Sequence, residues 1–421
     1  MSQTALGAAS AVEVQRRTVR VLCASQVLGG VGVATGIAIG GLLAEQIAGT
    51  AAVAGLAVTS SVVGAALLAV PVSRIMSRSG RRPGLALGYA VAGFGAGLLV
   101  LAAAVGSLPL VLAGMFLFGA GTTANFQARF AAADLATPQR RGTALSLVVW
   151  ATTVGAVLGP NLAAPAGRYA ESLGLPGLAG PFLVSALLFG LAGLFVSVLL
   201  RPDPLLLARA LSPQDGEPPA SRTSVRQALA AVTATVDGRL GLLAVVTAHA
   251  SMVAVMVLTP VHLGHGGASL TVIGLVISIH IAGMYALSPV VGWLADRLGR
   301  GPTILICALI LVAALVVAGT APAEGATQLG VGLFLLGLGW SFGLIAGSTL
   351  VTESVPTGVR PEAQGASDLV MGLSAGAAGA LAGPIVAVAG YGVLNLAAGA
   401  LVVPLLVLAA RRVLSPGRGT A

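Results

Sequence analysis

Charged residues are scarce in this sequence of 421 residues, at 8% of the chain. A typical soluble domain carries charge on about a quarter of its residues, so the composition excludes an ordinary soluble protein. Lysine is absent, aromatic residues make up only 4%, and cysteine occurs twice, at Cys23 and Cys307. Two cysteines do not make a disulfide framework. The sequence has no phosphate-binding loop and no Ser/His/Asp constellation, so we do not expect an enzyme.

Hydrophobic residues, in contrast, make up 57% of the chain. Apolar runs of about 20 residues, the length that spans a bilayer core, recur from end to end. The pattern predicts an all-α membrane protein with twelve transmembrane helices, and the 59 glycines favour close helix packing. The N-terminus lacks the features of a cleaved signal peptide. The expected spans are residues 19–43, 51–73, 83–105, 108–133, 143–167, 180–200, 241–263, 269–294, 302–320, 326–352, 364–389 and 391–410.

The arginines predict the orientation of these spans. They gather before the first span and after the even-numbered ones, and loops rich in arginine stay on the cytoplasmic side of a membrane. On the opposite face we find only Arg168. We therefore expect a multi-pass protein of the cell (inner) membrane with both termini in the cytoplasm. The arginines of the expected cytoplasmic face are Arg16, Arg17, Arg20, Arg74, Arg78, Arg81, Arg82, Arg140, Arg141, Arg201, Arg209, Arg222, Arg226, Arg239, Arg297, Arg300, Arg360, Arg411, Arg412 and Arg418.

A polar stretch divides the chain. Residues 201–240 are rich in proline, serine and charge, most of all at 212–219, which is typical of a flexible linker. We expect an N-terminal six-helix half at 1–200, a cytoplasmic linker at 201–240, a C-terminal six-helix half at 241–410 and a cytoplasmic tail at 411–421.

Two short motifs repeat between the halves. One follows the second and eighth spans, and the other, which includes Gly142 and Gly365, follows the fourth and tenth. The two pairs of echoes are separated by nearly the same length of chain, which indicates duplicated halves of parallel topology. The first motif consists of Arg78, Gly80 and Arg81 in the first half, and of Gly292, Asp296, Arg297, Gly299 and Arg300 in the second.

The second-half copy, Gly-x-x-x-Asp-Arg-x-Gly-Arg, resembles the recurring signature of the major facilitator superfamily, and the resemblance covers nearly the whole chain. It implies the major facilitator fold and a secondary transporter. It also implies that these loops contribute to a charge relay that steadies the outward-facing state, with Asp296 and Arg297 as candidates for gating. The first-half copy has Ser73 in place of the glycine and Ser77 in place of the aspartate, so its arginines can instead serve topology alone.

Histidine and methionine cluster in the second half. All four histidines and three of the seven methionines lie between His249 and Met284. Met252 with Met256, and His280 with Met284, are spaced i,i+4, so each pair shares one helix face. Met252 and His280 are both about 17 Å into the membrane, near its midplane. Thioether and imidazole together suit monovalent copper, although a methionine in such a pattern is also a common core residue.

These two pairs resemble the Met-x-x-x-Met and His-x-x-x-Met motifs of the CcoA-type copper importers, a major facilitator subfamily. The resemblance implies copper uptake by alternating access, with copper as the substrate and no resident cofactor. The implied ligands are Met252, Met256, His280 and Met284, with His249, His262 and His265 as candidate accessory ligands. Besides the bilayer and the substrate we expect no partner: no nucleic acid and no second copy of the chain.

Polar residues on the fourth span are a further candidate set. Asn125, Gln127 and Arg129 could contact a substrate, or Arg129 could form a structural pair with Asp134. Asp368 is expected to cap the eleventh span.

Two other transport functions stay open. Gly155, Gly159 and Pro160 resemble the glycine-proline motif of drug/proton antiporters, although such residues also permit a bend and close packing. An importer of a small organic solute is the other alternative. We expect no carboxylate in the middle of a span, so that proton coupling would depend on His280 or His249.

Overall fold

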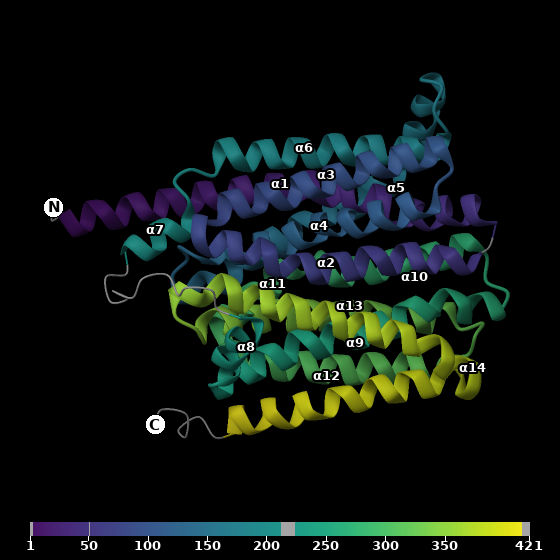
Figure 1. Cartoon of the computed structure of the whole chain (residues 1–421). Helices are drawn as coiled ribbons and strands as arrows, with labels where there is room; N and C mark the ends of the chain where they lie inside the picture. The colour runs from purple at the N-terminus through teal and green to yellow at the C-terminus, as the bar shows by residue number, and fades with distance from the viewer. Residues whose placement is uncertain (1–2, 50, 212–223, 415–421) are drawn as a thin grey trace. The chain divides into compact units, whose positions relative to one another are not determined.

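The computed structural model describes residues 3–49, 51–211 and 224–414, and this part of the chain consists of helices and turns without a strand. Long helices are expected here because a helix satisfies its backbone hydrogen bonds within the segment, which a bilayer requires. The elements are α1 Gln3–Ala48, α2 Ala51–Ser79, α3 Arg81–Val105, α4 Leu108–Ala133, η1 Pro138–Arg140, α5 Arg141–Ser172, η2 Gly177–Ala179, α6 Gly180–Leu199, α7 Pro204–Leu211, α8 Val225–Thr233, α9 Val236–His265, α10 Leu270–Tyr285, α11 Ser288–Leu298, α12 Arg300–Gly319, α13 Ala326–Glu353, η3 Thr357–Val359 and α14 Arg360–Leu414 (Figure 1).

Eleven helical segments of the described chain are long and apolar enough to cross a membrane. The last, Thr357–Leu414, has 58 residues, about twice what one crossing needs. Its helix α14 contains Gly390 at φ 84° and ψ 170°, a backbone conformation outside the helical region. Gly390 thus divides α14 into two spans, in agreement with the twelve that the sequence predicts.

The eighth span differs from the expected continuous helix. It consists of α10 and α11, which are separated at Ala286 and Leu287. Pro289 explains the break, because proline has no N–H to donate to the carbonyl of Tyr285 four residues earlier. The expected span at 269–294 corresponds to one candidate span, Val272–Leu298, which is made of two helices.

The expected linker also contains regular structure. Both α7 and α8 lie within residues 201–240, and α9 begins there at Val236. The proline-rich stretch at 212–219 lies outside the described residues. At the other end, α14 continues to Leu414, so that the first residues of the expected tail are helical.

The chain forms two compact units. Unit 1 consists of Met1–Thr137, Ala151–Val225 and Thr357–Leu369, and unit 2 of Pro138–Trp150, Arg226–Pro356 and Val370–Ala421. Two long helices therefore contribute to both units: α5 changes unit after Trp150, and α14 changes unit after Leu369. The expected halves were continuous segments, and these units exchange a short segment in each direction.

Small residues permit close packing in each unit. In unit 1, Gly155 of α5 lies against the backbone of Gly30 in α1, and Gly159 lies against Ala34. In unit 2, α13 is the central helix, since it packs along α9, α10 and α12. A side chain at Gly343 or Gly347 of α13 would collide with α9. The glycine-proline segment of α5 thus has a packing role, whatever else it does.

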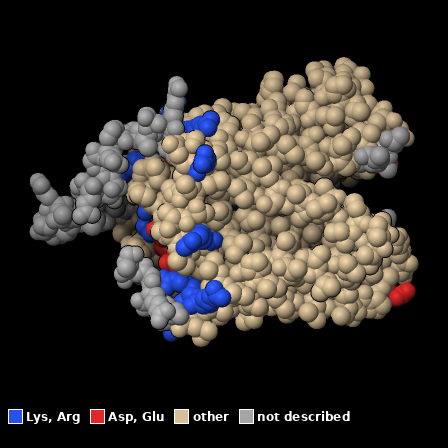
Figure 2. Space-filling view, turned by 60° about the horizontal axis from the view of Figure 1, so that its bottom comes forward, with Lys and Arg blue, Asp and Glu red and all other residues tan. Residues whose placement is uncertain are grey.

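The outer surfaces of the helices are almost without charge. Figure 2 shows broad areas with neither basic nor acidic side chains, and large apolar residues such as Phe94, Leu187 and Leu275 are exposed there. In a chain with helices of membrane-spanning length, such extensive exposed apolar surface is the surface that contacts lipid.

Candidate functional site

Two buried ion pairs lie in unit 1. The guanidinium of Arg81, which is wholly buried, donates from Nε and Nη2 to the carboxylate of Asp134 at 2.7 and 3.0 Å. Its Nη2 also donates to Oε1 of Gln364 in α14, at 2.6 Å. This two-bond fork is the strongest geometry for an arginine and a carboxylate. Arg81 therefore fixes the end of α4 and the first turns of α14 to the start of α3.

The second pair joins Arg129 of α4 to Asp368 of α14. Arg129 Nη2 donates to Oδ1 of Asp368 at 2.7 Å, and Gln127 Nε2 donates to Oδ2 at 2.9 Å. The guanidinium of Arg129 also lies over the rings of Phe126 and Phe130, at 5.0 and 4.2 Å from their centroids. Cation–π contacts of this kind compensate in part for the burial of the charge.

These pairs correct two expectations from the sequence. Arg129 pairs with Asp368 rather than with Asp134, because Asp134 is bound by Arg81. Asp368 does not cap a helix, since α14 begins eight residues earlier at Arg360. A carboxylate therefore does lie inside a membrane span. Asn125 accepts a hydrogen bond from the hydroxyl of Tyr89 at 3.0 Å.

The turn after α2 is held by residues that follow α6. Gly80 has φ 95°, and its open side lies against the carboxylate of Asp203. Asp203 accepts from the backbone N–H of Arg82, at 2.8 Å, and thereby caps α3. Arg209 of α7 donates to the carbonyls of Ser77, at 2.7 Å, and Gly358, at 3.0 Å.

Arg78, which the motif had made a gating candidate, is exposed. Asp203 and Arg209 follow the sixth expected span, which ends on the same side of the membrane as the first motif. That position is the feature of the sequence that could have identified them as its partners.

The equivalent turn in unit 2 uses an acid. Asp296 of α11 accepts from the backbone N–H groups of Gly142, at 2.9 Å, and Thr143, at 2.8 Å, and from the Thr143 hydroxyl at 2.7 Å. These N–H groups open α5, where a carboxylate compensates the positive end of the helix dipole. Gly292 lies against Gly142 and Ser146 with no room for a side chain.

The other members of the second-half motif have different surroundings. Arg300 donates to the carbonyls of Pro138 and Ala295 and to Glu353, at 3.0 Å for the latter two. Gly299 has φ 91°, which glycine adopts readily. Arg297 is exposed and lies over the ring of Trp293, outside this network.

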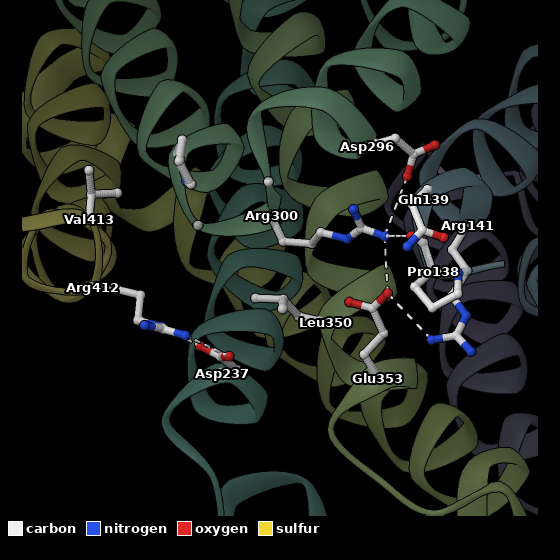
Figure 3. Close-up of a pocket in the computed structure, with 13 residues that line it drawn as sticks. Pro138, Gln139, Arg141, Asp237, Asp296, Arg300, Leu350, Glu353, Arg412 and Val413 are labelled. Atoms are coloured by element: carbon white, nitrogen blue, oxygen red, sulfur yellow. Dashed lines mark hydrogen bonds and ion pairs between the residues drawn. The ribbon is translucent and has the colours of Figure 1, made fainter. Parts of the chain in front are cut away.

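A cavity of about 660 Å³ lies beside this network in unit 2. Figure 3 shows Arg300 pointing toward Asp296 and Glu353, and the pair Arg412–Asp237 on another side of the cavity. Arg141 also reaches Glu353, at 3.4 Å. The lining of the cavity is balanced in charge, because it contains three arginines and three acidic residues. The residues that line it are Pro138, Gln139, Arg141, Asp237, Asp296, Gly299, Arg300, Gly301, Pro302, Leu350, Glu353, Arg412 and Val413.

His280 has the geometry of a ligand. Its Nδ1 lies 2.8 Å from the carbonyl of Leu333 in α13, and since a carbonyl only accepts, Nδ1 carries the proton. Its Nε2 is buried without a hydrogen-bond partner among the described residues. Metal-bound histidines are held in the same way through their other nitrogen. Met284, one turn later, and Met252 of α9 are buried, at 7% and 4% exposure, and Met256 is partly buried.

The accessory histidines are occupied by protein groups or exposed. The indole N–H of Trp340 donates to Nδ1 of His249 at 2.8 Å, so in the neutral ring the proton is on Nε2, a donor and not a ligand. His262 stacks on Tyr391 with ring centroids 4.2 Å apart. His265 is exposed at the end of α9.

The two expected pairs of copper ligands lie on helices that share few contacts, because α13 packs along both α9 and α10. No cluster of three or more histidine, cysteine, aspartate or glutamate residues able to hold a metal occurs in the described part of the chain. The copper ligands remain a prediction. Cys23 and Cys307 are not bonded to each other, and Cys307 Sγ donates to the carbonyl of Gly339.

A cluster that the sequence analysis missed lies around Trp340. The rings of Tyr285 and Trp340 meet edge to face with centroids 5.5 Å apart, and His249 is bound to the indole on another side. Each of the three residues lies near the midpoint of its span. The chain has only three tryptophans and four tyrosines. This scarcity is the feature of the sequence that could have drawn attention to the two aromatic residues of the cluster.

The sequence model described as the Major Facilitator Superfamily matches residues 20–266 and 240–420. The chain is 42% identical to the uncharacterized MFS-type transporter YdeG of Bacillus subtilis over 384 residues, covering 90% of this chain and 88% of that protein. It is 30% identical to the riboflavin transporter RfnT of Brucella anthropi over 391 residues, covering 90% and 92%.

Among solved structures, the human organic anion transporter MFSD10 superposes with a TM-score of 0.71 at 18% identity, covering 94% of this chain and 99% of that one. This likeness shows the fold alone. The family match covers nearly the full length and two motif-bearing halves. The chain therefore belongs to the major facilitator superfamily and is a membrane transporter rather than an enzyme.

Proposed function

We propose that the chain moves a small organic solute that contains a planar ring system, by alternating access driven by an ion gradient. The observation that carries this proposal is the midspan cluster of Trp340, Tyr285 and His249. Aromatic side chains offer a flat apolar surface together with a polar edge, which fits a ring with hydrogen-bonding groups. Transporters of this kind bind substrate near the bilayer midplane.

The break in the eighth span supports the same location. Tyr285 is the last residue of α10, and its carbonyl lacks the usual helical donor because Pro289 occupies that position. Irregular backbone at membrane depth occurs where it lines a cavity or is enclosed by protein, and discontinuous helices often bind the substrate. Tyr285 thus combines a ring, a hydroxyl and a carbonyl that receives no bond from the residue four positions later.

Riboflavin is the first compound to test. RfnT, the relative from Brucella anthropi, is named a riboflavin transporter, and riboflavin carries a planar ring system of the proposed kind. This relative favours the organic solute over copper.

Copper uptake is the second candidate, and His280 is the observation that favours it. The free Nε2 and the bonded Nδ1 are the arrangement of a metal ligand, and Met284 is the nearest thioether along the helix. The competing use of the same nitrogen is to accept a hydrogen bond from an organic solute.

Uptake into proteoliposomes that contain the purified chain distinguishes the two. We expect accumulation of radiolabelled riboflavin above that of protein-free liposomes. Trp340→Phe, which removes the indole N–H, should lower the initial rate about tenfold, whereas Trp293→Phe, at an exposed site of α11, should leave it unchanged. The organic solute is rejected in favour of copper if the chain takes up cuprous ion but not riboflavin, and if His280→Ala abolishes the uptake of cuprous ion.

The direction and placement are part of the proposal. We propose import across the cell membrane with both termini in the cytoplasm, because the arginines then lie in cytoplasmic loops. Protease accessibility of a C-terminal tag in spheroplasts tests the placement. Drug sensitivity of a strain without the gene tests the alternative, an antiporter that exports drugs.

A further inference from the structure

We propose that Asp368 is the proton-binding residue that couples the ion gradient to conformational change, with Gln127 and Arg129 as its partners. The inference rests on the proposed function, since it names the coupling ion of that transport. Its starting point is position: Asp368 lies inside a membrane span with 4% of its surface exposed. Ionisable residues at such positions are expensive to bury, and many of them relay protons.

The place of Asp368 in the chain links it to movement. Residues up to Leu369 of α14 pack with unit 1, and residues from Val370 onward pack with unit 2. Asp368 is thus the last charged residue of α14 before the helix changes unit. The bond from Asp368 to α4 of unit 1 holds this end of α14 together with the bond from Arg81 to Gln364, and loss of the Asp368 bond weakens that attachment.

The donors around the carboxylate select a proton over a metal cation. Each oxygen of Asp368 accepts an N–H, Oδ1 from Arg129 and Oδ2 from Gln127. Sodium and similar hard cations need several oxygen ligands, and both oxygens here already face positive hydrogens. A proton needs only one lone pair and one acceptor for the resulting O–H.

Gln127 can supply that acceptor. Its Oε1 is buried without a hydrogen-bond partner in the described structure, and its side chain is wholly buried. When Asp368 takes a proton from water, a half-turn of the Gln127 amide presents Oε1 to the new O–H in place of the N–H. A carboxamide can donate to a carboxylate and accept from a carboxylic acid, so Gln127 satisfies Asp368 in both states.

Asp134, the other buried acid of unit 1, does not fit this role. Both of its oxygens are bound by the same guanidinium, that of Arg81. Protonation there would disrupt two charge-assisted bonds at once. The single guanidinium bond at Asp368 makes it the easier of the two acids to neutralise.

Other charged residues lie on the elements near Asp368. Arg81 of α3 is bound to Asp134 at the end of α4, and Arg209 of α7 is bound to carbonyls. Arg360 and Glu362 lie in the first turn of α14 itself. Protonation of Asp368 therefore removes the negative charge that Arg129 Nη2 binds, which weakens the attachment of α14 to α4.

Hydrogen exchange of the purified full-length protein in lipid nanodiscs tests this without any substrate. The measured quantity is the protection of peptide 360–369, corrected for intrinsic exchange, at pH 8 and pH 5.5. In the wild type we expect protection to fall about tenfold or more at the lower pH, because a local opening becomes easier. Asp368→Asn should show low protection at both values. Asp237→Asn, which removes a pair with Arg412 in unit 2, should behave as the wild type does.

The double variant Arg129→Gln/Asp368→Asn removes both charges of the pair and is used if the single variant fails to fold. Its protection of peptide 360–369 should also be the same at both pH values. The proposal is overturned if wild-type protection is the same at both pH values, or if the variants at Asp368 keep the wild-type response. Riboflavin uptake is measured separately, so a wrong substrate and a wrong coupling residue give different results.

Discussion

The turn after α2 in unit 1 and the turn after α11 in unit 2 carry copies of one motif, but they hold their neighbours differently. In unit 2, Asp296 accepts three hydrogen bonds from the start of α5. In unit 1, Ser77 stands where the acid would be, and Arg209 binds its carbonyl together with that of Gly358. Unit 2 thus uses an acid that accepts from N–H groups, whereas unit 1 uses an arginine that donates to carbonyls.

The starts of the two neighbouring helices explain the difference. Gly142 is the second residue of α5, so its N–H is among those without a partner inside the helix. The equivalent Gly365 is the sixth residue of α14, and its N–H bonds within the helix. An aspartate at position 77 would therefore find no free N–H at this place. At this turn the groups that are bound are instead the carbonyls of Ser77 and Gly358.

The equivalent arginines Arg81 and Arg300 should differ most. Arg81→Ala leaves the buried Asp134 without its partner, so we expect a loss of about 3–5 kcal/mol in the free energy of unfolding. Arg300→Ala, at 11% side-chain exposure, should cost about 1–2 kcal/mol. Denaturant unfolding of the purified protein in detergent measures both. Equal losses would show that the two turns stabilise their units to the same extent.

Insertion of the missing acid tests the explanation from the helix starts. Ser77→Asp should destabilise the protein by about 1–3 kcal/mol, because the new carboxylate is buried without N–H donors. Ser79→Asp, at an exposed position two residues later, is the control and should be nearly neutral. A gain in stability from Ser77→Asp would mean that the first turn can use an acid after all.

Removal of the existing acid should have a smaller effect than loss of Arg81. Asp296→Asn keeps an acceptor for one N–H but loses the negative charge at the start of α5, which should cost about 1–2 kcal/mol. Asp237→Asn breaks a more exposed pair and should cost about 0–1 kcal/mol. The midpoints of unfolding give the comparison, and an effect at Asp237 larger than at Asp296 would contradict it.

The fold followed from the sequence because its signals are long and repeated. The apolar runs and the echoes at Gly80 and Gly299 sufficed for a duplicated twelve-span fold. The break after Tyr285 was missed although Pro289 was visible, because proline inside a membrane span often only bends the helix.

The site was predicted less well, since its partners are distant in the chain. Arg129 and Asp134 are near in sequence, and that proximity suggested a pair, but the true partner of Arg129 is Asp368, which lies more than two hundred residues away. Such pairings depend on which helix faces meet, and periodicity alone does not determine that. Methionine and histidine drew attention because they are rare and regularly spaced. Tryptophan is equally rare, but Trp340 belongs to no regular spacing pattern.

The division of α5 and α14 between the units has a consequence for the connectivity of the chain. The chain passes between the units five times, and two of these passages, after Trp150 and after Leu369, occur inside the long helices α5 and α14. Proteolytic cleavage at 212–223 would remove only one of the five connections. The two units therefore stay joined through α5 and α14 even when the linker is cut.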